Sequence, residues 1–138
     1  MRWSVLLAGL LGAIGVGIGA YAAHGLAASL QEQGLPAEEI ERRLQQCDVA
    51  VRYHMTHVLA ILVLGLCGPM GGWCRSAAIV AFLIGLALFS GGLYSLVFLG
   101  QAGHWAIVPT GGACFIVGWL LTAGLAWQAS RTHLPTEG

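Results

Sequence analysis

Four long apolar stretches, separated by three polar breaks, decide what this chain can fold into. They cover roughly residues 4–28, 49–69, 75–99 and 105–129. Each is near the ~20 residues that a helix needs to cross the ~30 Å hydrocarbon core of a bilayer. Because that core offers the backbone no water, a spanning segment must satisfy its own hydrogen bonds. The sequence therefore predicts an all-α fold, an integral membrane four-helix bundle in a single domain over residues 1–138.

The composition points to the same class of protein. Charged residues make up 9% of the chain and hydrophobic residues 57%, whereas soluble proteins carry about 25% charged residues. The formal net charge is +0 and lysine is absent, so the chain lacks the basic face that nucleic acid requires. We expect the lipid bilayer as a partner and no nucleic acid.

The first apolar stretch has two interpretations. Arg2 and the Ala-Tyr-Ala sequence at residues 20–22 resemble a signal peptide with its cleavage site. However, the apolar run is longer than the apolar region of most signal peptides. Gly12, Gly15 and Gly19 also fall on one helix face, and small residues on one face let helices pack closely in membranes. We favour a retained first span.

Residues 29–48 form the only long polar stretch. Pro36 suits a helix start, and Glu38 and Glu39 suit the positive end of the helix dipole. Apolar residues then recur with helical spacing at Ile40, Leu44, Cys47 and Val51. We expect a short amphipathic surface helix between spans 1 and 2. A solvated connector is the alternative.

Several polar side chains fall within the apolar stretches at a similar depth. In an up-and-down bundle with a rise of 1.5 Å per residue, they lie roughly 6–12 Å inside one face of the membrane. Ionisable groups at such positions are costly and indicate a functional site. The candidate binding residues are His24, Tyr53, His54, His57, Ser90 and Tyr94. We expect His24, His57 and Tyr94 to meet in one pocket, and His54 and His57 to share a helix face.

Three interpretations of this pocket remain open. In the first, the side chains only hydrogen-bond across helices, a contribution that averages ~0.6 kcal/mol per bond. Alternatively, neutral imidazoles bind a metal, haem, a quinone headgroup or another small ligand. A catalytic role has the least support, because no buried carboxylate pair or activated nucleophile is evident. We assign no catalytic residues, and the metal and cofactor are unknown.

Four sequence motifs resemble those of a known family. They are GAYAAHGL at 19–26, AVRYHMTHVLAIL at 50–62, LFSGGLYSL at 88–96 and PTGGACFIVGWLL at 109–121. They are similar to the YgdD/YwdK-like family of small, uncharacterised membrane proteins of bacterial inner membranes and mitochondria. The resemblance implies a four-span bundle and no particular activity.

The family pattern carries over to individual positions of this chain. These are Gly19, His24, Gly25, Tyr53, His57, Ser90, Gly91, Tyr94, Pro109, Gly111, Gly112 and Trp119. His54 is a departure, because relatives often resemble Gln at this position. The resemblance therefore favours His24 with His57 over a pair formed by His54 and His57.

From these observations we expect a non-enzymatic, multi-pass protein of a bacterial cell (inner) membrane. Its leading function is that of a structural or accessory component, in a homo-oligomer or a larger membrane complex. The alternative is binding or permeation of a small molecule, metal or cofactor through the His/Tyr pocket. Arg2 and Arg75 in short flanks favour cytoplasmic N- and C-termini.

Overall fold

The computed structural model describes residues 2–67, 72–100 and 105–132, with side chains up to Leu125 in the last segment, and every element there is helical. The elements are α1 (Arg2–His24), α2 (Leu26–Glu32), α3 (Ala37–Leu66), α4 (Gly72–Gly85), the π-helix η1 (Leu86–Ser90), α5 (Gly91–Leu99) and α6 (Ile107–Thr132). Four continuous helical runs are long and apolar enough to cross a membrane, namely Trp3–His24, Ala37–Leu66, Gly72–Leu99 and Ile107–Leu125. The all-α fold with four spans is therefore confirmed.

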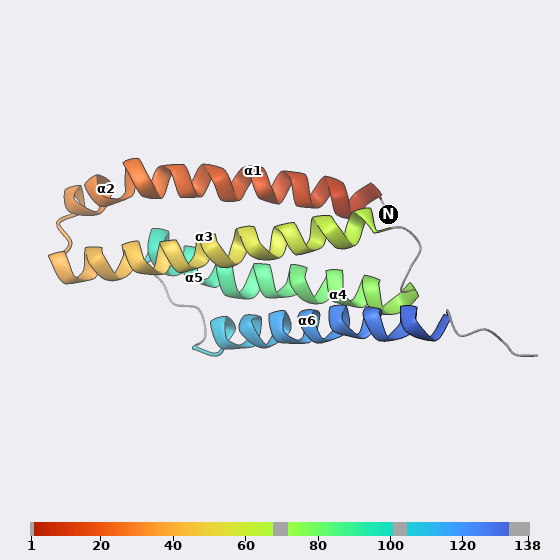
Figure 1. Ribbon diagram of the computed structural model, residues 1–138. Helices are drawn as coiled ribbons and strands as arrows, with labels where there is room; N and C mark the ends of the chain where they lie inside the picture. Colours follow the sequence, from red (N-terminus) through yellow and green to blue (C-terminus); the bar gives the residue numbers. More distant parts are fainter. Residues whose placement is uncertain (1, 68–71, 101–104, 133–138) are drawn as a thin grey trace, which may run out of the picture.

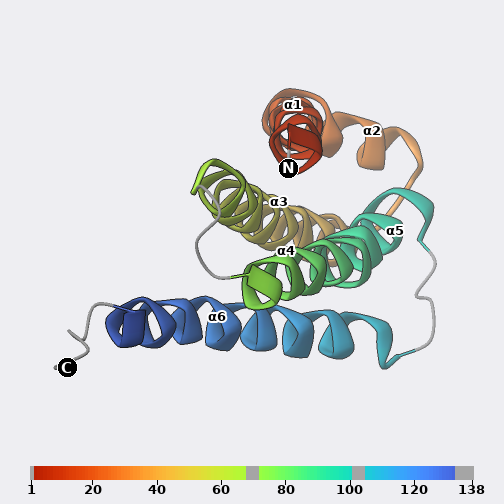
Figure 2. The same cartoon turned by 90° about the vertical axis from the view of Figure 1, so that its right-hand side faces the viewer.

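The four long helical runs are stacked side by side in chain order (Figure 1). α1 packs along α3, α3 packs against α4, η1 and α5, and α6 packs along α4 and η1. Figure 2 shows α1 and α6 at the two outer edges, with α3 and α4–α5 between them. In an apolar 18-residue stretch of each span, 11% of the residues of α1 and 17% of those of α6 are buried, against 33% and 39% for the two inner spans. The outer helices therefore leave most of their surface to the bilayer or to partners.

The amphipathic stretch in the polar region is the beginning of α3 and continues directly into the second span. Pro36 is the N-cap of this helix, as its position in the sequence predicts. α3 has 30 residues, or about 45 Å, which exceeds the ~30 Å hydrocarbon core. The helix does not end before the span because no glycine or proline lies between Ala37 and Leu64.

A small hydrophobic core lies at the end of the bundle where α3 begins. The apolar stripe of α3 meets the short helix α2 and the end of α5 there. Its buried members are Leu26, Leu30, Ile40, Cys47 and Val97. Arg43 of α3 also donates a hydrogen bond to the carbonyl of Val97, at 3.2 Å. A cation near the C-terminus of α5 is favoured by the helix dipole.

At the other end, Arg75 of α4 plays the same part for α3. Its guanidinium donates to the carbonyl of Cys67, the C-cap residue of α3. The side chain is buried, and it supplies a donor and a positive charge where helix carbonyls lack intrahelical partners. Arg43 and Arg75 thus fasten opposite ends of α3 to the third span.

Glycines bring α6 very close to the third span. A Cβ on Gly111 would lie 2.4 Å from the backbone nitrogen of Phe89, within η1. A Cβ on Gly118 would lie 2.5 Å from the ring of Phe82. Side chains at these two positions would prevent this approach. The glycine face of α6 therefore points to α4 and η1, and its larger residues are left to face α3.

Candidate functional site: a groove between α3 and α6

Two histidines in the middle of α3 are buried on different sides of the helix. His54 is 4% exposed and His57 is 3% exposed. Because they are three residues apart, their directions differ by about 60° around the helix axis. That difference is enough to turn His54 toward α1 and α5, and His57 toward α4 and α6.

His54 lies in a tightly packed seam. Its Nε2 is 2.9 Å from the carbonyl oxygen of Leu11, and the hydroxyl of Tyr94 is 3.3 Å from its Nδ1. Since a carbonyl only accepts, Nε2 carries the proton, and in the neutral ring Nδ1 accepts from Tyr94. Gly15 of α1 makes room, because a Cβ there would lie 2.6 Å from the sulfur of Met55 and 3.0 Å from His54.

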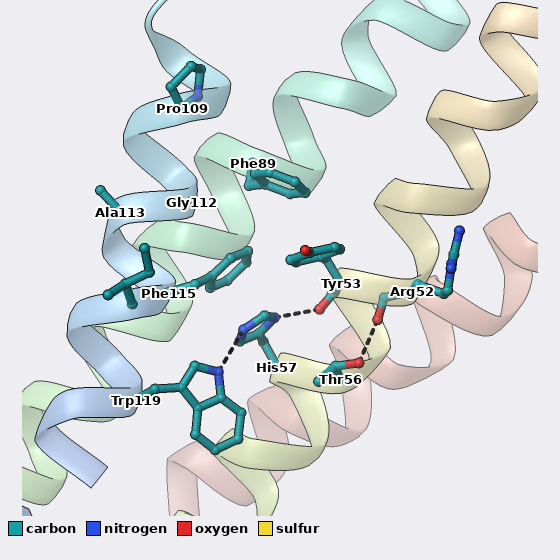
Figure 3. A pocket seen from close by; sticks show the side chains of 11 residues that line it. Arg52, Tyr53, Thr56, His57, Phe89, Pro109, Gly112, Ala113, Phe115 and Trp119 are labelled. Atoms are coloured by element: carbon teal, nitrogen blue, oxygen red, sulfur yellow. Dashed lines mark hydrogen bonds between the residues drawn. The ribbon is translucent and has the colours of Figure 1, made fainter. Parts of the chain in front are cut away.

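His57 has the opposite tautomer. Its Nδ1 is 2.7 Å from the carbonyl oxygen of Tyr53, so Nδ1 carries the proton. Its Nε2 accepts the indole N–H of Trp119 at 3.2 Å. The ring is also stacked on Phe115, with centroids 3.5 Å apart and planes at 6°. Figure 3 shows the bond from Trp119 to His57 joining α6 to α3.

Beside this bond lies a groove with a cavity volume of about 700 Å³. Small-molecule sites typically measure about 300–1,000 Å³ and are mostly apolar with a few polar groups. The groove is lined by Arg52, Tyr53, Thr56, His57, Phe89, Pro109, Gly112, Ala113, Phe115, Ile116 and Trp119. Aromatic rings form much of its wall (Figure 3). Tyr53, Thr56, Ala113 and Ile116 are exposed, so the groove opens to the outside of the bundle.

The six predicted binding residues do not gather in one pocket. Tyr53 and His57 line the groove. His54 and Tyr94 are bonded to each other on the other side of α3. Ser90 is fully buried and donates to the carbonyl of Ala50 at 3.1 Å.

His24 is the clearest correction. It is exposed at the end of α1, so the expectation that His24, His57 and Tyr94 share one pocket was wrong. α1 meets α3 through Gly12, Gly15 and Gly19. His24 lies five residues beyond Gly19 and is therefore turned about 140° away from that contact face. A similar depth in the membrane does not imply the same direction.

This arrangement gives a metal site little support. Within the described residues, no group of three or more His, Cys, Asp or Glu side chains could hold a metal ion. The pair of His24 and His57 is not brought together. The Nε2 of His57 already accepts a hydrogen bond from Trp119, and an indole N–H is a donor only.

Sequence reasoning missed the aromatic part of the site. A choice of polar residues by their depth in the membrane does not include Phe89, Phe115 and Trp119 among the candidate binding residues, because these three look like ordinary apolar residues of a span. The available signal was the motif at 109–121, which contains Phe115 and places Trp119 in the family pattern. Trp119 is 47% exposed and is joined to a buried histidine.

The four apolar helices define the chain as a multi-pass α-helical membrane protein. Residues 18–112 match the family described as "Protein of unknown function (DUF423)", and the chain belongs to this family. This match confirms the resemblance found in the sequence.

Relatives occur in bacteria and in yeast. A UPF0382 membrane protein of Haemophilus influenzae is 33% identical, over 85% of this chain and 87% of the relative. The UPF0382 membrane protein YwdK of Bacillus subtilis is 32% identical over 88% and 93%. The UPF0382 membrane protein C1782.12c of Schizosaccharomyces pombe is 33% identical over 85% and 93%. No solved structure matches the chain.

Proposed function

We propose that this protein is a non-enzymatic membrane protein that binds a small amphipathic molecule from the bilayer in the groove between α3 and α6. The observation that carries this proposal is the groove of about 700 Å³, with aromatic walls and an outward opening. An apolar site of this size with few polar groups is typical of small-molecule binding. A molecule dissolved in the membrane could enter it sideways.

The chemistry of the groove supports binding rather than catalysis. The lining residues include no carboxylate and no thiol. The ring of His57 is oriented by the backbone carbonyl of Tyr53 and not by a carboxylate. The hydroxyl of Thr56 donates to the carbonyl of Arg52 at 2.8 Å. A nucleophile needs an adjacent base that is oriented by a third group, and these contacts do not provide that arrangement.

Native mass spectrometry of gently extracted protein tests this function. Ala113→Trp places a large ring in the groove from an exposed position that lines it. Ala123→Trp adds the same ring at an exposed position of α6 that is not among the lining residues. We expect a co-purified small molecule to be lost from the first variant and kept by the second. Equal retention by both variants would rule out the groove as the binding site.

We also propose a location and an orientation, namely the bacterial cytoplasmic membrane with both termini in the cytoplasm. Arg75 lies at the start of α4, beside the end of α3, and basic residues in short flanks favour the cytoplasmic side. The side chain of Arg2 lies outside the described part of the chain. Reporter fusions at both termini test the orientation, and a periplasmic signal from either terminus would contradict it.

Assembly with further copies is a second candidate function, favoured by the outer face of α1. Gly9, Ala13 and Gly17 are exposed and recur every four residues. A Cβ on Gly9 or Gly17 would meet nothing within 4 Å. Such spacing of small residues is typical of helix dimers in membranes. If this face joins two copies, Gly9→Leu with Gly17→Leu will reduce the oligomer measured by light scattering, and an unchanged mass will contradict it.

A further inference from the structure

We propose that the groove recognises a neutral ring that carries a hydroxyl group, such as the head of a phenol-type amphiphile. The hydroxyl would sit between Trp119 and His57 and bond to both. This inference rests on the proposed binding function and names the ligand class that the groove selects. The inference follows from which atoms donate and which accept where Trp119 of α6 is hydrogen-bonded to His57 of α3.

His57 presents a fixed acceptor to the groove. Its Nδ1–H is held by the carbonyl of Tyr53 at 2.7 Å, which leaves the lone pair on Nε2. The ring is 3% exposed and lies against Phe115 with centroids 3.5 Å apart. Rotation or tautomer exchange would break the bond to Tyr53. A ligand that reaches His57 must therefore bring a hydrogen-bond donor.

Trp119 presents a hydrogen-bond donor from a partly exposed side chain. Its indole N–H donates to Nε2 of His57 at 3.2 Å, and indole has no acceptor to offer. The residue is 47% exposed, and its ring makes an edge-type contact with the ring of Phe82, with centroids 5.3 Å apart. To admit one oxygen that bonds to both nitrogens, their separation must widen to roughly 5 Å. Figure 3 shows Trp119 beside His57 on the wall of the groove, so an outward rotation of this exposed indole is the movement that the proposal requires.

A hydroxyl group satisfies both partners at once. Its oxygen accepts the N–H of Trp119, and its hydrogen is donated to Nε2 of His57. An ether or a ketone would accept from Trp119 but leave the lone pair of His57 without a donor. A carboxylate has the same defect and adds a charge. Leaving a buried polar atom unpaired is costly, so these groups are disfavoured.

The rest of the groove selects a ring without net charge. Arg52 is the one charged lining residue, and its guanidinium pairs with Asp48 one turn earlier. The groove therefore offers no uncompensated charge for an ionic headgroup. Tyr53 and Phe89 hold their rings 4.7 Å apart along the wall. Aromatic walls favour a flat ring through offset or edge contacts.

The test uses the full chain in detergent micelles, with tryptophan labelled with ¹⁵N. The probes are 4-nonylphenol and its methyl ether, which has the same ring and tail but no O–H. We expect the phenol to shift the indole N–H signal of Trp119 saturably, with at least about tenfold higher affinity than the ether. Trp119→Phe assigns that signal. Equal affinities, or no shift of Trp119, would overturn the inference.

Two substitutions separate the ligand class from the site. His57→Phe removes the acceptor, so the phenol and the ether should bind with equal affinity. Tyr94→Phe, a control in the seam around His54, should keep the preference for phenol. If His57→Phe does not fold, the affinities of the phenol and the ether for the unsubstituted protein still test whether the groove prefers a hydroxyl group.

Ala113→Trp distinguishes failure of the inference from failure of the proposed function. Binding of both probes, with equal affinity and both abolished by Ala113→Trp, would overturn the hydroxyl inference while supporting the groove as a binding site. Binding that survives Ala113→Trp would contradict both proposals, because the probes would then lie elsewhere.

Discussion

The two sides of α3 contrast sharply, although each carries one buried histidine. Toward α1, His54 lies in a closed seam where Gly15 leaves just enough room for the ring. Toward α6, His57 lies beside a groove of about 700 Å³. Each ring has two hydrogen-bond partners, and the tautomers are opposite. The histidines alone therefore do not decide which side forms a site.

The difference comes from the face that each outer helix turns toward α3. α1 presents a stripe of small residues, and a Cβ on Gly12 or Gly19 would reach α3 side chains at 3.6 Å and 3.4 Å. In α6, the glycines that allow close contact, Gly111 and Gly118, pack against the third span. This helix therefore turns larger residues such as Trp119 toward α3. Small residues let two membrane helices approach closely, whereas large residues between them keep the backbones apart.

The largest effect is expected where α6 meets the third span, because that contact positions the groove. Gly111→Ala forces a Cβ to 2.4 Å from the backbone nitrogen of Phe89, and a backbone atom inside a helix cannot move aside. We expect a loss of about 3 kcal/mol of unfolding free energy, as for severe overpacking. Thermal unfolding in detergent measures it. Gly124→Ala, where a Cβ would meet nothing within 4 Å, is the control, and equal losses would contradict the packing.

A smaller loss is expected in the closed seam. Gly15→Ala brings a Cβ to 2.6 Å from the sulfur of Met55, the flexible end of an adaptable side chain. We expect about 1 kcal/mol of destabilisation. Gly17→Ala on the open face of α1 should be nearly neutral. If Gly17→Ala is as harmful as Gly15→Ala in the same unfolding assay, α1 does not face α3 as described.

The smallest effects distinguish the hydrogen bonds on the two sides. Tyr94→Phe removes the hydroxyl that pairs with Nδ1 of His54 in the closed seam, at an expected cost of about 1 kcal/mol. Trp119→Phe removes the donor to Nε2 of His57 at the open groove. Molecules from outside can replace that donor, so we expect about 0.5 kcal/mol. A larger loss for Trp119→Phe would contradict the contrast between the seams.

The fold could be predicted from the sequence because hydrophobic length alone defines a span. The helix start at Pro36 and the packing role of Gly15 and Gly19 also follow from local rules. The continuity of α3 was missed, because a change from polar to apolar residues looks like a boundary although no residue breaks the helix. Composition changes at the membrane surface, whereas the helix itself does not.

The site was only partly predictable. Counting residues from the ends of spans gives the depth of a side chain but not its direction around the helix. Tyr53 and His57, which were expected in a pocket, do line the groove, while His24 was placed in a pocket that it does not face. A binding role for Tyr53 and His57 stays a prediction. The groove itself depends on how α6 is rotated by Gly111 and Gly118, and no pattern within α3 reports that rotation.

The central claim is that α3 has one closed side and one open side, with the two histidines held in opposite tautomers. ¹⁵N chemical shifts of the imidazole nitrogens, measured with ¹⁵N-histidine in the purified protein near neutral pH, report each tautomer directly. We predict the Nε2–H form for His54 and the Nδ1–H form for His57, assigned by the loss of each signal in His54→Gln and His57→Gln. The same tautomer at both positions, or free exchange between forms at His57, would contradict the account.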